Sequence, residues 1–190
     1  METPSLKGQL LIAMPGMPDP RFAGTVSLVC YHNNEGAMAL VLNRLVGTLR
    51  VDQVLDSLKS DIQLNLRELR VHLGGPVATG RGFVLHGDEL KHHDSQDVTD
   101  DVALNATTEV LHKLIMMENI ADAVPYRFAL GCASWTAGQL EDELRRGAWI
   151  TAPATRDLVF MPELAKMWQQ SMMHAGINHP ELLVAETGTA

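Results

Sequence analysis

Two apolar runs, residues 25–31 and 37–42, are separated by a short polar segment that ends in Gly36. Asparagine tolerates the left-handed backbone and glycine reaches positive φ without steric cost, so residues 32–36 predict a tight turn. The two runs are therefore predicted to pair as an antiparallel hairpin. Their apolar residues are nearly continuous and do not alternate with polar ones, which indicates a sheet that is covered on both faces.

Shorter patterns along the chain indicate the other elements. We expect strands at residues 8–14, 69–73, 81–86 and 126–133, extended or turn structure at 149–152 and 157–160, and a short edge strand near 97–99 within the polar loop 87–101. We expect helices at residues 48–59, at 107–120, between Thr136 and a glycine stop at Gly147, and at 162–175.

This order of elements predicts an α/β class with an α+β-like mixed sheet: a compact, largely antiparallel β-sheet core with hairpins, flanked by about four helices. The length of 190 residues suits a single domain, which we place at residues 1–176. A small subdomain within residues 45–105 is the alternative division. Residues 177–190 show no clear pattern and are predicted to form a C-terminal tail.

The charge of the chain argues against several functions. The net charge is −8, and the 15 basic residues are scattered singly or in pairs. Binding to a nucleic-acid backbone needs concentrated Lys and Arg, so direct nucleic-acid binding is not expected. No segment approaches the ~18 apolar residues that cross a membrane, and the N-terminus does not resemble a secretory signal. We therefore expect a cytoplasmic protein, as a monomer or homodimer, in which Cys30 and Cys132 are buried free thiols.

Residues 131–150 carry the densest local signals. Thr136 and Gln139 match a capping box at the start of a helix, and Trp135 and Leu140 occupy the positions of a hydrophobic staple. Two ion pairs with the acid four residues before the base are expected along this helix, Glu141–Arg145 and Asp142–Arg146. These features explain the segment as structure. Anion binding at the helix N-terminus is the weaker alternative, because Thr136 and Gln139 already cap it.

Known catalytic motifs are not matched. The surroundings of Cys132 lack the paired cysteine pattern of cysteine proteases, and Ser134 does not lie in Gly-x-Ser-x-Gly. The glycines at 74–75 and 80–82 form no phosphate-binding loop and predict turns.

The polar loop holds the densest group of metal-ligand side chains. Its members are His86, Asp88, Glu89, His92, His93 and Asp94. The adjacent His92 and His93 are expected to point apart, and their spacing is not that of a zinc site. A solvated loop is therefore predicted, with no metal or cofactor.

Several segments together resemble the YqgE/AlgH family, in the right order and from about residue 6 to residue 176. They are Ala13-Met14-Pro15-Gly16-Met17-x-Asp19-Pro20-x-Phe22, His32-Asn33-x-x-Gly36-Ala37-Met38-x-Leu40-Val41-Leu42-Asn43-Arg44, Leu73-Gly74-Gly75-Pro76-Val77, Arg81-Gly82-Phe83-x-Leu85-His86, and Leu130-Gly131-x-Ala133-x-Trp135-x-x-Gly138-Gln139-Leu140-Glu141-x-Glu143. The resemblance implies a bacterial cytosolic protein with a compact mixed-sheet fold, and it implies no particular activity. Some members carry the label of transcriptional regulator, to which an acidic chain without a clear helix-turn-helix lends little physical support.

Two functional hypotheses follow. The first is a non-enzymatic regulatory or binding protein that takes a protein partner or a small anionic ligand into a groove. The candidate ligand-binding residues are Asp19, Arg21, Asn43, Arg44, Gly74, Gly75, Arg81, His86, Trp135 and Gln139. The alternative is a hydrolase or transferase acting on an anionic small molecule or nucleotide, with Arg44, Arg81, His86 and a carboxylate such as Asp19 as the reacting and binding groups.

Overall fold

The computed structural model describes residues 4–50, 68–106 and 124–186 of the chain. The strands are β1 (Gln9–Ala13), β2 (Val26–Asn33), β3 (Gly36–Val41), β4 (Leu45–Arg50), β5 (Glu68–Leu73), β6 (Val77–His86), β7 (Gln96–Asp97), β8 (Ala103–Asn105), β9 (Tyr126–Thr136) and β10 (Trp149–Pro153). The helices are the 3-10 helix η1 (Asp88–Leu90), α4 (Gln139–Arg145), α5 (Arg156–Val159), α6 (Leu164–His174) and α7 (Pro180–Glu186). None of these described helices is long and apolar enough to cross a membrane.

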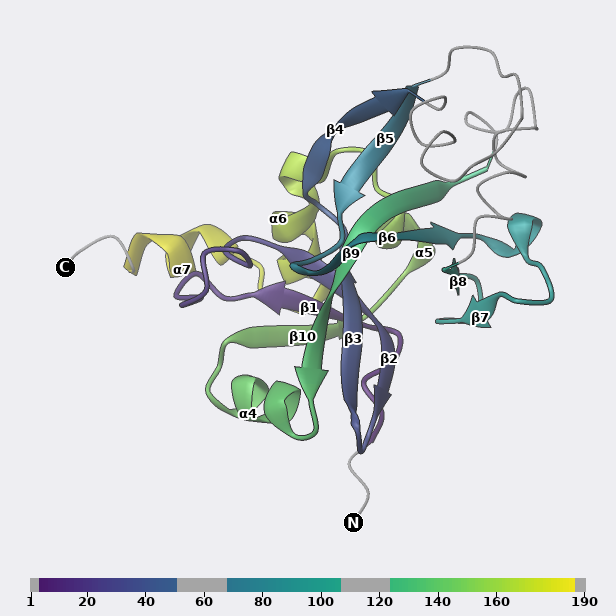
Figure 1. The fold of residues 1–190 in the computed structure, drawn as a ribbon. Helices are drawn as coiled ribbons and strands as arrows, with labels where there is room; N and C mark the ends of the chain where they lie inside the picture. The colour runs from purple at the N-terminus through teal and green to yellow at the C-terminus, as the bar shows by residue number, and fades with distance from the viewer. Residues whose placement is uncertain (1–3, 51–67, 107–123, 187–190) are drawn as a thin grey trace.

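The long strand β9 lies at the centre of the sheet (Figure 1). It pairs with β3 on one side and with β6 on the other. The path β10-β1-β2-β3-β9-β6-β8-β7 is antiparallel at each step. The β4–β5 hairpin joins through a parallel pairing of β5 with residues 128–130 of β9. The predicted mixed and largely antiparallel sheet with flanking helices is therefore confirmed.

The β2–β3 hairpin is covered on both faces, as its continuous apolar sequence predicts. On one face Leu28 and Leu40 are fully buried in a core that includes Met167 of α6. On the other face Val29 is buried in a second core with Leu140 of α4. Neighbouring residues of one strand thus enter different cores, which is why alternation of polar and apolar residues is missing from the sequence.

Helix α4 begins later than the capping box predicts. Its N-cap is Gly138, in a left-handed conformation with φ of 75°, and the predicted Thr136 cap was wrong. The reciprocal half of the box is present, because the Gln139 side-chain oxygen accepts a hydrogen bond from the Thr136 N–H at 3.1 Å. Glycine adopts this backbone without a steric cost, so the N-cap lies two residues later than the predicted Thr136 cap.

The ion pairs of α4 also differ from those predicted. Asp142 pairs with Arg145, three residues later. The predicted Glu141–Arg145 and Asp142–Arg146 pairs do not form. Glu141 instead contacts the ring of His32 on β2, at 3.0 Å. The Leu6 N–H donates to the Nδ1 atom of that ring, so Nε2–H donates to Glu141. The acid therefore fastens α4 to the sheet.

Two other local predictions were wrong. Residues 48–50 of the predicted helix 48–59 belong to β4, where pairing with β5 overrides the helical spacing of apolar residues, and the rest of that segment lies outside the described residues. Residues 157–159, expected to be extended or in a turn, lie in α5, which the Thr155 side chain caps by accepting from the Leu158 N–H. Within the segment predicted as a C-terminal tail, Pro180–Glu186 form α7. The helix expected at 107–120 lies outside the described residues.

Candidate functional site

A cavity of about 700 Å³, here called the aromatic cavity, opens beside α4. The loop after β1, the end of β9, α4 and the start of β10 contribute its walls. Its lining residues are Met14, Gly16, Met17, Pro18, Asp19, Arg21, Phe22, Pro76, Val77, Ser134, Trp135, Gln139, Glu143, Arg146, Gly147, Ala148 and Trp149. Most of this surface is apolar, with charged side chains among it, which is typical of a binding pocket.

Three aromatic rings form the packed wall of this cavity. The centroid of the Phe22 ring lies 5.5 Å from that of Trp149 and 6.4 Å from that of Trp135, and the two indoles lie 6.2 Å apart edge to face. Both tryptophans are buried, whereas Phe22 is half-buried. Such edge and offset arrangements are the favourable geometries for aromatic pairs.

Glu143 of α4 holds the two indoles in place. Its Oε2 atom accepts hydrogen bonds from the Nε1–H of Trp135 at 2.9 Å and of Trp149 at 2.8 Å. Its Oε1 atom accepts from the side-chain amide of Gln139 at 3.1 Å. Sequence reasoning found Trp135 and Gln139 but missed Glu143, although its position one turn after Gln139 indicates that it shares their helix face.

The loop after β1 is ordered by its own polar groups. The Asp19 carboxylate accepts from the backbone and guanidinium of Arg21, and the side-chain contact lowers the pKa of Asp19. The Phe22 N–H donates to the Asp19 carbonyl, and the Thr25 N–H donates to the Phe22 carbonyl. These turns place Phe22 over the indoles and leave Arg21 exposed at the rim.

A side recess of about 170 Å³ lies beside the aromatic cavity and shares Arg21, Phe22 and Pro76 with it. The recess is also lined by Pro20, Val41, Arg44, Leu73 and Gly75. Arg44 donates to the Ala23 carbonyl, which anchors its guanidinium at this edge. Asn43 has a structural role, since it accepts from the Val26 N–H and donates to the Gly24 carbonyl.

Gly74 and Gly75 are required by the close approach of two backbones. A Cβ on Gly74 would lie 2.2 Å from the Gly131 carbonyl oxygen, and a Cβ on Gly75 would lie 2.1 Å from the Cys132 carbonyl carbon. The Val41 N–H donates to the Gly74 carbonyl, which ties this turn to the end of β3. Of the two glycines only Gly75 lines the recess, and neither offers a side chain to a ligand.

Arg81 and His86 do not join the other predicted residues. The Arg81 guanidinium lies over the ring of Phe83, 5.3 Å from its centroid. His86 is fully buried and contacts the Gly87 carbonyl at 2.8 Å and the Asn105 side chain at 2.6 Å. Neither residue lines the aromatic cavity or the side recess. The set of Arg44, Arg81, His86 and Asp19 that the enzyme hypothesis requires is thus not assembled in the aromatic cavity or the side recess.

The cysteines and the surface histidines fit no catalytic role. Cys30 and Cys132 are both free and buried, as predicted, and burial raises the pKa of the Cys30 thiol to about 12 and also raises that of Cys132. The expectation that His92 and His93 point apart was wrong, because their ring centroids lie 4.0 Å apart. Asp94 lies with them, and all three are exposed.

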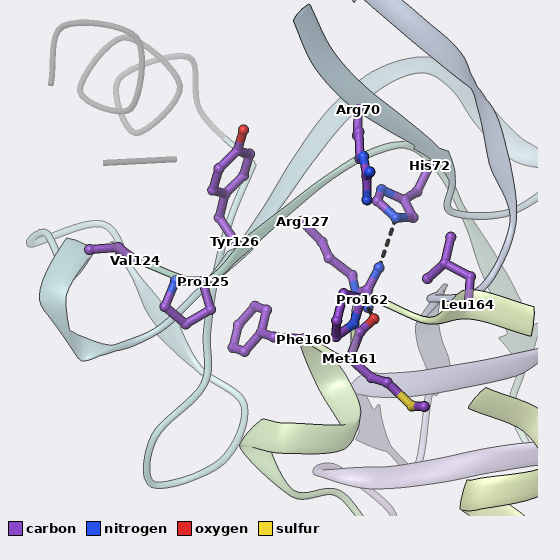
Figure 2. Close-up of a pocket in the computed structure, with 10 residues that line it drawn as sticks. All are labelled: Arg70, His72, Val124, Pro125, Tyr126, Arg127, Phe160, Met161, Pro162 and Leu164. Carbon is purple, nitrogen blue, oxygen red and sulfur yellow. Dashed lines mark hydrogen bonds between the residues drawn. The ribbon is translucent and has the colours of Figure 1, made fainter. Parts of the chain in front are cut away.

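A second cavity, of about 400 Å³, was missed by the sequence reasoning and is here called the arginine cavity (Figure 2). Its lining residues are Arg70, His72, Val124, Pro125, Tyr126, Arg127, Phe160, Met161, Pro162 and Leu164. The sequence could have indicated this cavity, because His72 and Arg127 lie inside segments predicted to be buried strands. A charged group in a buried strand needs a partner.

Arg127 is buried and is held on three sides. Its Nε–H donates to the Val159 carbonyl and Nη2 to the Met161 carbonyl, while Nη1 donates to the Nε2 atom of His72 at 2.8 Å. The Nδ1 atom of His72 contacts the Phe128 carbonyl at 3.2 Å. A carbonyl only accepts, so Nδ1 carries the proton of His72 and Nε2 is left as the acceptor for Arg127.

These surroundings keep His72 neutral and Arg127 charged at neutral pH. Burial, followed by the charge of Arg127, lowers the pKa of His72 from 6.5 to about 4. Burial, followed by the charge of Arg70, lowers the pKa of Arg127 to about 10.

The protein is expected to lose stability as the pH falls from about 6.5 to about 4. Unfolded His72 takes up a proton below its ordinary pKa of 6.5, whereas folded His72 stays neutral down to about 4. The unfolded state binds more protons in this window, so the free energy of unfolding falls with pH, by up to ~3 kcal/mol from this group.

Chemical denaturation from pH 7 to pH 4 checks this expectation. The variant His72→Gln, which keeps an acceptor for Arg127 but does not titrate, should show a flatter dependence. A measured pKa near 6.5 for His72 in NMR titration would contradict the assignment.

Comparisons with known proteins place the chain in a family. Residues 10–180 match the model of a family described as AlgH-like. A UPF0301 protein of Rhodospirillum rubrum is 40% identical over 185 residues, covering 97% of this chain and 94% of the relative, and a UPF0301 protein of Desulforapulum autotrophicum is 34% identical over 179 residues, covering 93% of each.

Solved structures agree with this match. The solution structure of the AlgH protein from Pseudomonas aeruginosa is similar with a TM-score of 0.76 and 35% identity, covering 100% of this chain and 97% of that one. A crystal structure of protein DIP2367 from Corynebacterium diphtheriae shares the fold, with a TM-score of 0.72 and 20% identity, covering 96% and 92% of the two chains. The sequence matches along nearly the whole chain and the shared fold show that this protein belongs to the AlgH-like family.

Proposed function

We propose that this is a non-enzymatic binding protein of the bacterial cytosol that holds a short, extended segment of a protein partner in the aromatic cavity. The segment would place an apolar side chain against Phe22 and the two indoles and an acidic group near the arginines at the rim. The observation that carries this proposal is a 700 Å³ cavity whose wall is an aromatic cluster fixed by one carboxylate. Free buried cysteines and bacterial relatives support the compartment.

The surface around the cavity supports a macromolecular partner. Leu73 and Val77, which line the side recess and the aromatic cavity, are 40% and 44% exposed, and Leu45 and Val46 of β4 are 46% and 61% exposed. Leu45 pairs with His72, the chain neighbour of Leu73, in the β4–β5 ladder. Large apolar side chains exposed at the rim of a cavity favour a partner that covers them.

The charges around the cavity favour an acidic group in the partner. Arg21, Arg44 and Arg146 line the aromatic cavity or the side recess, whereas the carboxylates there are Asp19 and Glu143. Asp19 pairs with Arg21, and Glu143 is occupied by the indoles. No described histidine lines either space, which supports binding rather than acid–base catalysis.

A peptide selection tests the proposal. Peptides selected from a random library on the intact protein are expected to combine an aromatic or aliphatic residue with Asp or Glu, and to change the tryptophan fluorescence when bound. Phe22→Ala should weaken their binding by about tenfold or more, since it removes one side of an aromatic contact. Arg44→Ala should reduce the dependence of the affinity on salt.

Tyr31→Ala is the matched control, because Tyr31 is an aromatic residue that is 48% exposed and does not line the cavity. Peptides that bind Phe22→Ala as well as they bind the unchanged protein would refute the proposed site. Turnover of a small molecule that depends on the cavity residues would refute the non-enzymatic assignment.

A further inference from the structure

We propose that the arginine cavity is a second, separate binding site, which takes the dianionic phosphate group of a small phosphomonoester between Arg70 and Arg127, with the apolar body of the ester in the rest of the cavity. This inference does not depend on the function proposed for the aromatic cavity.

The charge of the cavity calls for an anion. Arg70 and Arg127 line it, and His72 between them is neutral because its Nε2 atom serves as an acceptor. No carboxylate occurs among the ten lining residues that the structure describes. Two guanidinium groups near each other match the charge of a phosphomonoester at neutral pH better than that of a monocarboxylate.

Arg127 is positioned in advance to bind such a group. A guanidinium has five N–H groups, and the contacts to Val159, Met161 and His72 use one on each of its three nitrogens. One N–H on each terminal nitrogen remains for a further acceptor, and these two groups match two oxygens of a phosphate. Because the side chain is buried and already immobile, little conformational entropy is lost when an anion binds, and the low dielectric strengthens the contact.

The size of the cavity indicates more than inorganic phosphate. About 400 Å³ falls within the range of small-molecule sites. In Figure 2 the three basic side chains gather on one side of the cavity, whereas Tyr126, Pro125 and Phe160 lie on the other side. An aromatic or aliphatic group esterified to the phosphate would cover this apolar side, so phenyl phosphate is a suitable probe.

A purely structural reading of Arg127 is that it only fastens β9 to residues 159–161. Arg70 separates the two readings, because it is exposed and takes no part in the three contacts that hold Arg127. Its charge nevertheless acts on Arg127 and on His72, which places it beside both. If Arg127 only connects β9 to residues 159–161, Arg70 is not needed. If the cavity binds an anion, Arg70 supplies one of the two positive charges.

Isothermal titration calorimetry of the intact protein tests the proposal. Phenyl phosphate is expected to bind about tenfold or more tightly than inorganic phosphate, which lacks the apolar group, or benzoate, which carries only one negative charge. Arg70→Ala should weaken the binding of phenyl phosphate by about tenfold or more. Arg44→Ala, which removes the same charge at the side recess, should leave it unchanged, and so should Phe22→Ala in the aromatic cavity.

NMR titration of His72 gives a second readout that needs no disruptive variant. A dianion beside the ring offsets the charges of the two arginines, so phenyl phosphate should raise the pKa of His72. Absence of phenyl phosphate binding, or an equal loss with Arg70→Ala and Arg44→Ala, would overturn the proposal. Failure of the peptide selection at the aromatic cavity would leave these expected results unaffected.

Discussion

Replacing Gly75 by alanine is expected to lower the free energy of unfolding by ~3 kcal/mol or more. A Cβ at this position would lie 2.1 Å from the carbonyl carbon of Cys132, 2.3 Å from its oxygen and 2.3 Å from the nitrogen of Ala133. All three atoms are backbone atoms of the central strand β9, so no side-chain rotation relieves the clash.

The turn would have to move away from β9 to accept the methyl group. That movement stretches two hydrogen bonds of Gly74, one from its N–H to the Leu130 carbonyl and one from the Val41 N–H to its carbonyl, both 2.8 Å long. It also displaces Gly75 and Pro76 from the wall of the side recess. Loss of peptide binding should therefore accompany the loss of stability.

Thermal unfolding followed by circular dichroism measures the effect. A loss of this size corresponds to a fall of ~6–12 °C in Tm for a chain of this length. Gly80→Ala on β6 is the matched control, because a Cβ there would meet nothing within 4 Å, and its Tm should stay within about 2 °C. Equal Tm values for the two variants would contradict the close approach of the two backbones.

Glu143→Ala is expected to destabilise the protein by ~2–4 kcal/mol and to abolish the defined geometry of the aromatic cavity. The substitution leaves the indole N–H groups of Trp135 and Trp149 without their acceptor, and both tryptophans are buried. The Gln139 amide also loses its contact with the carboxylate. A donor left unpaired in a buried position costs its desolvation energy as well as the lost hydrogen bond.

Glu143→Gln should recover much of the loss, because the amide oxygen still accepts from the indoles, although without the strength that a charge adds. Asp142→Ala is the control on the same helix, and it removes only an exposed pair with Arg145, worth less than ~1 kcal/mol. Urea unfolding of the three variants measures the differences. Tryptophan fluorescence should shift in Glu143→Ala alone, and an unshifted spectrum would contradict the role of Glu143.

The aromatic cavity and the arginine cavity differ in the chemistry of the side chains that line them. The wall of the aromatic cavity consists of aromatic rings, and the indole N–H groups there already donate to Glu143. Burial of apolar surface would therefore be the main source of affinity for a ligand in this cavity. The arginine cavity has two arginines and no carboxylate among the described residues that line it, in a chain whose net charge is −8. The anionic ligand that we propose for the second cavity would therefore bind against the overall electrostatic field of the protein and would depend on local contacts.

Turn residues, capping residues and the spacing of apolar residues correctly predicted the parts of the fold in which a short segment determines its own conformation. The β2–β3 hairpin follows from two apolar runs around a turn ending in Gly36, and the continuous apolarity of both runs correctly indicated two covered faces. The glycine stop of α4 follows in the same way, because Gly147 has a positive φ of 71° that glycine adopts without steric cost.

Local rules failed where pairing with a distant segment decides the conformation. Residues 48–50 have apolar neighbours at helical spacing, yet they pair with β5 because the ladder satisfies their backbone groups. Gly138 replaced Thr136 as the N-cap of α4 because β9 continues through Thr136 in its pairing with Gly36 of β3.

The sequence by itself determined the family, the largely antiparallel sheet and the segments that surround the aromatic cavity. Only the tertiary structure decided which of their side chains face that cavity, because Glu143 meets two indoles from different strands and His86 is buried elsewhere. The arginine cavity depends on tertiary structure still more, since Arg70, His72 and Arg127 come from β5 and β9, which pair in parallel across more than fifty residues of chain. Short-range patterns contain no information on such register, because the pairing energy arises only when the two strands meet.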